Sequence, residues 1–354
     1  PEHYRYYYIL VVLPLLAGCL EGLGAVATSR WFGLVLAYIS YMVITSLWSE
    51  QFSWAEFARV AWYGALVAVF VLVTAVLRNR DPLRFDKLLR ALVVLAAATG
   101  LVSIVAWYSR NPFPVARLQP ISRMDHEILA ACAYGFFALL ALHFFRMEHS
   151  RLLRAVFFLA LLTLIATVLL TQSRTALVAL IVASTVLAGV KGRIAIASLA
   201  AIVAVALAVQ PELWQGLTRR MPYRFGIWSA ALDQALQHWL LGSGYLSDST
   251  VQVQELSFVH AHNAYLATFR DGGVVGLGLL LAVFGSAAVS AFRLDRRNGE
   301  VYYLALILYG MVCAIPDLDR ILTRPREIWL FLWLPIALVM VDIQRPGRAS
   351  SAQR

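Results

Sequence analysis

The feature that most constrains this chain is a series of apolar stretches that are long enough to cross a lipid bilayer as helices. A helix needs about 20 apolar residues to span the hydrocarbon core. We count eleven such stretches, at residues 6–27, 32–49, 57–77, 88–108, 127–145, 153–171, 174–189, 193–209, 272–292, 301–317 and 327–343. Their apolar residues are continuous and do not alternate, which excludes a transmembrane β-barrel. We therefore expect an all-α polytopic membrane protein.

Composition agrees with this class and narrows the possible partners. The chain is 61% apolar and 14% charged, which is typical of a membrane protein and not of a soluble domain. A net charge of +10 could indicate nucleic-acid binding. The basic residues lie in short loops between spans, however, as the positive-inside rule requires, so we expect no nucleic-acid partner. The three cysteines lie inside apolar stretches without metal-ligand spacing, which predicts core residues.

Loop charge predicts the orientation of the spans. Short basic loops at 78–90, 146–154, 191–193, 293–297 and the tail from 345 belong in the cytoplasm. The opposite, external side then holds 49–59, 110–126, the turn at Arg174, 210–262 and 317–327. This arrangement places the first residue outside, and that residue is not a methionine. Two explanations are open: one further span upstream, making twelve in all, or removal of a methionine before Pro1. The predicted parts are an N-terminal bundle (1–209), a large external loop (210–271), C-terminal spans (272–343) and a cytoplasmic tail (344–354).

The external loop contains a predicted amphipathic helix. Residues 227–241 carry apolar side chains at helical spacing, with Trp228 and Trp239 on the apolar face. Such a helix could lie at the membrane interface, and packing against the helical bundle is an equally good alternative. Gly242, Ser243 and Gly244 follow and predict a turn.

External arginines run against the positive-inside bias. Arg117 and Arg123 lie in a proline-stiffened loop, Arg174 lies between two apolar helices, and Arg219, Arg220 and Arg224 precede the amphipathic helix. Guanidinium groups present a fork that matches phosphate oxygens. We expect an anionic ligand on the outer face, although solvated or snorkelling side chains would explain each arginine singly.

Two histidines end the external loop. His260 and His262 could join Asp248 and Glu255 around a metal, but the spacing matches no standard site. A neutral imidazole at His262 is a competent base for a sugar hydroxyl near neutral pH. Asn263 is predicted to cap a short helix that stops at Gly272 and Gly273. The spans hold few ionisable groups, which argues against an ion-coupled transporter.

Several short blocks together resemble one family. They are LWSE at 47–50, Arg117-Leu118, Ser173-Arg174, YRFGIWSAAL from Tyr223, LLGSGY from Leu240, and HAHNAYL with GGVVG between 260 and 276. The chain resembles the O-antigen ligase and polymerase superfamily (WaaL- and Wzy-like) from about residue 30 to 343. The resemblance implies a GT-C-type glycosyltransferase with a large periplasmic loop in the bacterial inner membrane. It also implies inversion without a metal or other cofactor.

The resemblance assigns roles to individual residues. His262 matches the catalytic histidine, and Arg117 and Arg174 match arginines that hold pyrophosphate, with Arg224 before Trp228 as a further candidate. The fifth span begins with Met124-Asp125-His126 where relatives often read N-P-N, so Arg123 is the alternative to Arg117. Supporting positions are Asn263, His260, Trp228, Gly242 and Gly244.

The partners implied by the resemblance are an undecaprenyl-pyrophosphate-linked O-antigen donor, a lipid A-core acceptor and membrane lipid. The single long external loop favours a ligase. An O-antigen polymerase and a protein O-glycosylation ligase are open enzyme alternatives. The alternative from another class is a lipid-linked sugar flippase or transporter, which would show acidic groups at mid-membrane or inverted repeats. The sequence shows neither.

Overall fold

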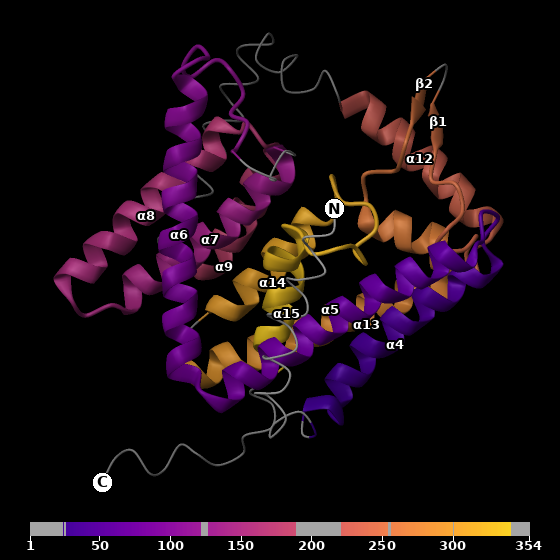
Figure 1. The fold of residues 1–354 in the computed structure, drawn as a ribbon, viewed down its shortest axis with the longest axis horizontal. Helices are drawn as coiled ribbons and strands as arrows, with labels where there is room; N and C mark the ends of the chain where they lie inside the picture. The colour runs from indigo at the N-terminus through magenta and orange to yellow at the C-terminus, as the bar shows by residue number, and fades with distance from the viewer. Residues whose placement is uncertain are drawn as a thin grey trace.

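The computed structural model describes residues 24, 26–121, 127–188, 221–253, 256–299 and 301–340, and these residues are mostly helical (Figure 1). Helices α6 to α9 pack together, α4, α5 and α13 form a second group, and α14 and α15 lie between them. The bounds are α4 Arg30–Thr45, α5 Trp54–Arg80, α6 Pro82–Tyr108, α7 Glu127–Met147, α8 Arg151–Leu170, α9 Arg174–Leu187, α12 Met221–Gln237, α13 Ala264–Asn298, α14 Tyr302–Cys313, η3 Trp329–Trp333 and α15 Leu334–Val339, with a short η2 at Ser46–Trp48.

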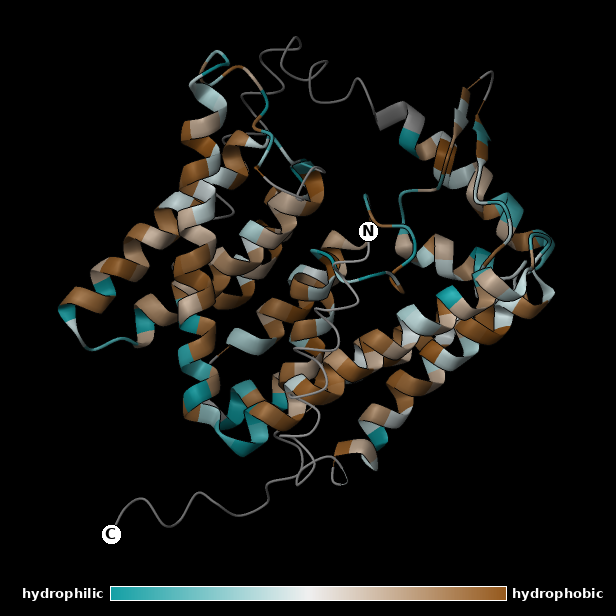
Figure 2. Ribbon diagram, in the orientation of Figure 1, coloured by the Kyte–Doolittle hydropathy of each residue, from teal (hydrophilic) through white to brown (hydrophobic). Residues whose placement is uncertain are grey.

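Among the described residues, six helices are long and apolar enough to cross a membrane, and the hydropathy colouring of Figure 2 shows that hydrophobic residues predominate in the helices. They are Arg30–Trp48, Trp54–Arg80, Pro82–Tyr108, Glu127–Met147, Arg151–Leu170 and Ala264–Arg297. Three shorter apolar helices, Arg174–Leu187, Tyr302–Cys313 and Trp329–Val339, coincide with further predicted spans. The predicted spans 6–27 and 193–209 lie almost wholly outside the described residues. The protein is an integral membrane protein.

The predicted break between the sixth and seventh spans is confirmed. Helix α8 ends at Leu170, and α9 begins at Arg174 after Ser173, whose hydroxyl caps the new helix by accepting from the Ala176 N–H. Gln172 adopts a positive φ of 52° in the turn between them. The turn therefore places Arg174 in the first turn of a helix, at the same end of the bundle as the C-terminus of α8.

Helix α13 differs from the expectation of a short helix followed by a separate span. Asn263 caps its start as predicted, accepting from the N–H groups of Tyr265 and Leu266. The helix does not stop at Gly272 and Gly273 but kinks there, with Gly273 at φ 63° and ψ −165°. Only glycine adopts such angles readily, so the glycine bends the helix instead of ending it.

The kink frees backbone groups that the segment 239–244 then binds. The N–H groups of Ser243 and Gly244 donate to the carbonyls of Arg270 and Asp271, at 2.8 and 3.0 Å. In return, the Val274 N–H donates to the Trp239 carbonyl at 2.8 Å. The Tyr41 hydroxyl of α4 satisfies the Gly272 carbonyl at 2.9 Å. The external segment is thus fixed onto the kink by hydrogen bonds that a straight helix would make internally.

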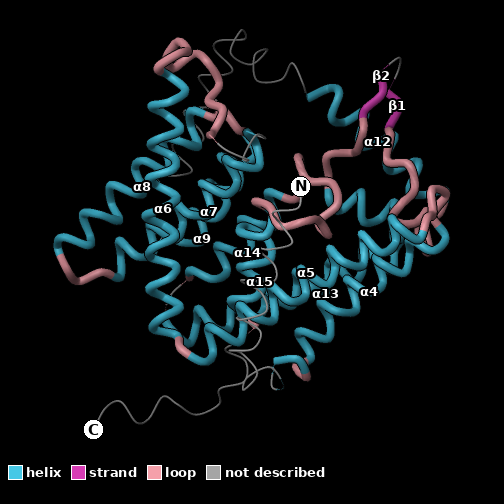
Figure 3. Tube along the Cα trace, viewed as in Figure 1, coloured by secondary structure: helices cyan, strands magenta, loops and turns pink. Residues whose placement is uncertain are grey.

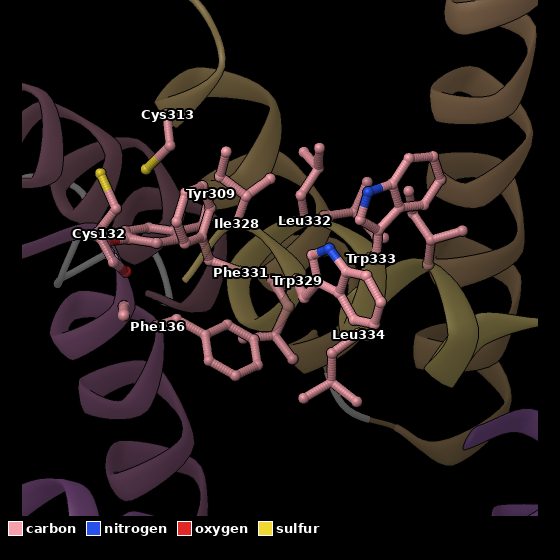
Figure 4. Packing of buried hydrophobic residues seen from close by; sticks show 14 of the residues in the cluster. Cys132, Phe136, Tyr309, Cys313, Ile328, Trp329, Phe331, Leu332, Trp333 and Leu334 are labelled. Carbon is pink, nitrogen blue, oxygen red and sulfur yellow. Dashed lines mark hydrogen bonds between the residues drawn. The ribbon is translucent and has the colours of Figure 1, made fainter. Parts of the chain in front are cut away.

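The core lies where α7, α14 and the π-helix η3 meet (Figure 4). Trp333 and Phe331 are fully buried, and the Tyr309 hydroxyl donates to the Cys132 carbonyl at 2.8 Å. Tyr309 lies so close to Gly135 that a Cβ there would clash with its ring. Cys132 and Cys313 are buried free thiols, which confirms the prediction that they are core residues.

The predicted external loop combines α12 with a small antiparallel hairpin, β1 (Val251–Val253) and β2 (Leu256–Phe258), in which Val251 lies opposite Phe258 (Figure 3). The predicted helix 227–241 is shifted, since α12 runs from Met221 to Gln237 and a turn follows. Ile227, Ala231 and Ala235 are buried, while Phe225 and Leu236 are 64% and 52% exposed. One side of the amphipathic helix therefore packs against protein, and another apolar side faces outward.

Candidate functional site

His262 has an unusual backbone conformation. Its φ is +51°, which lies in the left-handed region of backbone conformation that residues other than glycine rarely adopt. Such conformations cost roughly 1–3 kcal/mol and gather at functional sites, where the surrounding structure enforces them. The turn places the ring of His262 against that of His260, with centroids 4.0 Å apart and planes at 63°. The two histidine rings therefore meet through this turn.

The residues directly after His262 are held by hydrogen bonds. Directly after it, Asn263 caps α13, and the Ala264 N–H donates to the Ala314 carbonyl at 3.0 Å. Ala314 ends α14 and begins the loop that contains Asp317. The start of the histidine-bearing helix is therefore docked on this loop.

Asp317 connects two of the predicted arginine positions to that loop. Its Oδ1 lies 2.8 Å from Nη2 of Arg224, and its Oδ2 accepts from the hydroxyl of Thr175. The Asp317 side chain is only 3% exposed. Thr175 directly follows Arg174, so one buried carboxylate joins the start of α9 to α12. The sequence did not identify Asp317 as the partner of Arg224.

Arg117 reaches the same region from the loop after α6. Its Nε donates to the Thr171 carbonyl at 2.8 Å, and the Leu118 N–H donates to the Leu170 carbonyl at 2.9 Å. Thr171 lies at the C-terminus of α8, in the turn that leads to Arg174. The structure therefore links Arg117, Arg174, Arg224 and His262 through neighbouring contacts at one end of the bundle. Arg123, Arg219 and Arg220 lie outside the described residues.

This arrangement is chemically suited to a polyphosphate. Three guanidinium groups lie in connected elements, and the N-terminus of α9 adds its partial positive charge beside Arg174. Helix N-termini and arginines are the groups that bind phosphate oxygens most readily. The segment that carries His262 docks on the loop that contains Asp317, through the hydrogen bond from the Ala264 N–H to the Ala314 carbonyl. The site can therefore combine an anion-binding surface with a proton acceptor.

Gly242 and Gly244 support the site through the backbone. The Gly242 carbonyl accepts from the Trp48 indole at 3.2 Å, and the Leu246 N–H donates to the Ser49 hydroxyl at 2.9 Å. Both glycines have positive φ, and a Cβ on either would collide with neighbouring backbone. The LWSE block, the LLGSGY block and the kink in α13 thus meet in space. The glycines of the LLGSGY block allow the backbones of these three segments to pack closely.

Trp228 lies in the interior of the external part. It packs against the small apolar cluster formed by Ile227, Ala231, Val251 and Ala261 and contacts Phe225 edge-on, with centroids 6.0 Å apart. Ala261 separates the two histidines. Trp228 therefore supports the histidine segment from the α12 side.

Asp248 serves a local turn. Its Oδ1 accepts from the backbone N–H and the hydroxyl of Thr250, at 2.9 and 2.7 Å, and these hydrogen bonds hold the pKa of the Asp248 carboxyl below its usual value. In the part of the chain that the structure describes, no three His, Cys, Asp or Glu side chains gather as a metal site would require. Glu255 lies outside that part.

Sequence reasoning missed a buried ionic group in α13. Arg270 is 2% exposed and Asp271 is fully buried. Asp271 Oδ1 accepts from Arg270 Nε at 2.8 Å, and its Oδ2 accepts from Arg320 Nε at 2.7 Å. Burial lowers the pKa of Arg320, but the charge of Asp271 and the hydrogen bond to it outweigh burial, so the net pKa is raised.

The Arg270–Asp271 pair lies just before the predicted span, in the first part of the longer helix α13. The span was predicted to begin at residue 272, whereas α13 begins at Ala264 and so includes the Arg270–Asp271 pair. The Arg-Asp-Gly-Gly sequence was the available signal for this buried ionic group, because charged side chains next to an apolar span are buried only when they are paired.

Comparison with known proteins agrees with these features. Residues 157–281 match a family model described as O-antigen ligase, a range that includes Arg174, Arg224 and His262 and leaves out Arg117. An O-antigen ligase from Pseudomonas aeruginosa is 28% identical over 355 residues, covering 96% of this chain and 84% of that protein. The chain resembles the O-antigen ligases. The resemblance extends over nearly the whole chain, so it includes the helical bundle as well as the external site.

Proposed function

We propose that this protein is an O-antigen ligase that transfers O-antigen polysaccharide from undecaprenyl pyrophosphate to lipid A-core at the periplasmic face of the inner membrane. The observation that carries the proposal is the linkage of His262 with Arg117, Arg174 and Arg224 at one end of the helical bundle. The similarity to an O-antigen ligase over 96% of the chain supports the same activity.

The orientation of the helices supports an external site. Helix α8 begins beside the basic loop 146–154 and ends at the turn before Arg174. Helix α13 begins at the histidine segment and ends with Arg296 and Arg297 in its last turn. Positive charge marks the cytoplasmic ends of membrane helices. The candidate site therefore belongs to the opposite, periplasmic side.

The chemistry we propose is a single displacement. The neutral imidazole of His262 accepts the proton of an acceptor sugar hydroxyl while that oxygen attacks the anomeric carbon of the donor. The bond from the anomeric carbon to the pyrophosphate oxygen breaks, and its electron pair leaves with undecaprenyl pyrophosphate. Attack from the face opposite the leaving group inverts the anomeric configuration.

The arginines stabilise the leaving group. Negative charge grows on the bridging pyrophosphate oxygen as its bond breaks, so groups that bind this charge in the transition state lower the barrier. Arg117, Arg174 and Arg224 supply that charge stabilisation in our proposal. The guanidinium groups thereby take the role that a divalent cation serves in other transferases, which makes the reaction metal-independent.

The outward side of α12 suits entry of a lipid substrate. Phe225, Leu232 and Leu236 of α12 are 64%, 40% and 52% exposed, and Trp239 in the turn that follows is 57% exposed. Exposed apolar side chains that include tryptophan are typical of a helix at the membrane interface. We place this side of α12 at the outer leaflet, where a lipid-linked donor reaches Arg224 without leaving the membrane.

The test is transfer in vitro with purified protein in detergent. Undecaprenyl-pyrophosphate-linked glycan and lipid A-core are mixed with the protein in the presence of EDTA, and the mobility of lipid A-core is followed. The proposal predicts a shift of lipid A-core to larger size. A ladder of longer lipid-linked chains from the donor alone would instead indicate a polymerase. No product from either reaction would favour a transporter.

A further inference from the structure

The buried ionic group in α13 is expensive for the fold and needs an explanation. Removing a charged side chain from water costs several kcal/mol per ion, and replacing a buried ion pair by apolar residues is often neutral or stabilising. Arg270 and Asp271 are almost completely buried, directly before the kink at Gly273. We therefore ask whether this ion pair fixes the position of neighbouring segments of the chain.

The two arginines around Asp271 both hold the segment after the Gly244 turn. Arg320 Nη2 donates to the Ser247 carbonyl at 3.1 Å, and Arg270 Nη1 donates to the Ser249 carbonyl at 3.4 Å. The guanidinium of Arg320 also lies over the ring of Tyr245, 4.9 Å from its centroid. Asp271 fixes both arginines and so fixes residues 245–249 against α13.

Ser249 passes this constraint to the histidine segment. Its hydroxyl donates to the Val259 carbonyl at 2.8 Å. Val259 directly precedes His260, whose ring touches that of His262. The helix cap at Asn263 holds His262 from one side, and the Ser249 hydrogen bond holds the same short segment from the other.

We propose that Ser249 is a positioning residue for His262, anchored by Arg270 and the carboxylate of Asp271. This inference rests on the proposed role of His262 as the base. The bond from Ser249 keeps Val259 and His260 in place, and the contact between the two imidazoles keeps His262 aimed at the acceptor hydroxyl. Loss of the bond should therefore slow the chemical step without weakening donor binding, because the arginines are untouched.

The experiment compares Ser249→Ala with Ser249→Thr and with Ser257→Ala in the intact membrane protein, using the lipid A-core transfer assay. Threonine retains the hydroxyl. Ser257 lies on the neighbouring hairpin, where its hydroxyl accepts from the Gln252 side-chain amide at 3.2 Å. Melting temperature in detergent is measured for every variant, so that activity is compared between folded proteins.

The expected result is a kcat for Ser249→Ala that is about three- to tenfold lower, as loss of one neutral hydrogen bond allows, with an unchanged KM for the donor. Ser249→Thr should recover most of the kcat, and Ser257→Ala should behave as wild type. A second variant, Arg270→Lys, should lower kcat in the same way, and combining it with Ser249→Ala should add little, because both remove one linkage.

A wild-type kcat for Ser249→Ala would overturn the inference, as would an equal loss in Ser257→Ala or a loss confined to KM. His262→Ala separates this failure from failure of the proposed function. If His262→Ala is inactive while Ser249→Ala is normal, only the positioning role is wrong. If His262→Ala is active, the proposed chemistry itself is wrong.

Discussion

At the scale of single residues, Asp317 is the contact on which the candidate site depends most. Its carboxylate is 3% exposed and is shared between Arg224 and Thr175. A buried carboxylate that loses its cation is destabilising, whereas removing both charges together restores balance. Mutating Arg224 alone, or Arg224 together with Asp317, can therefore separate an effect on stability from an effect on substrate binding.

We expect Arg224→Ala to lower the free energy of unfolding by about 1 kcal/mol, a modest value because the Arg224 side chain is 38% exposed. The double variant Arg224→Ala with Asp317→Asn should regain that stability yet stay impaired in transfer, because the guanidinium is still missing. Thermal unfolding and the transfer assay measure the two effects. Full activity in the double variant would mean that Arg224 serves only the fold.

Asp248 predicts a pH dependence of local stability. Hydrogen bonds from Thr250 lower the pKa of its carboxyl in the folded protein. A group with a lowered pKa stabilises the fold above its ordinary pKa, and the contribution disappears as pH falls through the lowered value. The stability difference between wild type and Asp248→Asn should therefore shrink as the pH falls from 6 to below about 3.8, the ordinary value. A difference that is constant with pH would contradict this assignment.

At the scale of elements, the kinked helix α13 organises the external part. Its kink at Gly273 exposes backbone groups that bind residues 239–244, and its first residues carry the cap beside His262. The α12 boundary follows from the same bonds. After Gln237, the Trp239 carbonyl and the Ser243 N–H, which would pair with each other in a continued helix, bind α13 instead.

We expect Gly273→Ala to destabilise the protein by about 2 kcal/mol or more. The added methyl would meet the backbone of Leu240 in a conformation that disfavours any side chain. Gly278→Ala is the matched control, since a Cβ at Gly278 meets no atom within 4 Å and the position is helical. Chemical denaturation of both variants provides the measurement. Equal stability of the two would show that the kink is not under this constraint.

The elements were predictable where a single physical signal defines them. Apolar length located the spans, the polar tetrad located the break before Arg174, and Asn263 was identified as a cap from the sequence around it. The start of α12 at Met221, before the predicted start at residue 227, also had a signal in the sequence. Pro222 lies in the first turn of the helix, where proline is favoured. Contacts between distant segments had no such signal, so Asp317 with Arg224 and Asp271 with Arg320 were found only in the structure.

At the scale of the whole molecule, the account requires the site and the basic loops to lie on opposite sides of the membrane. Helices α8, α9, α13 and α14 each have one end at the candidate site. This common polarity is a stronger argument than the charge of any single loop.

Cysteine labelling tests this polarity. Ser257→Cys should react with a membrane-impermeant maleimide in cells whose outer membrane alone is opened. His149→Cys, in the exposed loop between α7 and α8, should react only after the inner membrane is broken. The described native cysteines are buried and should contribute little background. The reverse pattern of labelling would place the site in the cytoplasm.

The central claim is that His262 performs chemistry in a folded external site, and lipid A-core transfer by His262→Ala tests it most directly. His238→Ala is the matched control, since His238 is an exposed histidine in the turn after α12. We predict at least a hundredfold loss of kcat for His262→Ala with wild-type melting temperature, as removal of a general base requires, and normal transfer for His238→Ala. Normal transfer by His262→Ala would contradict the account.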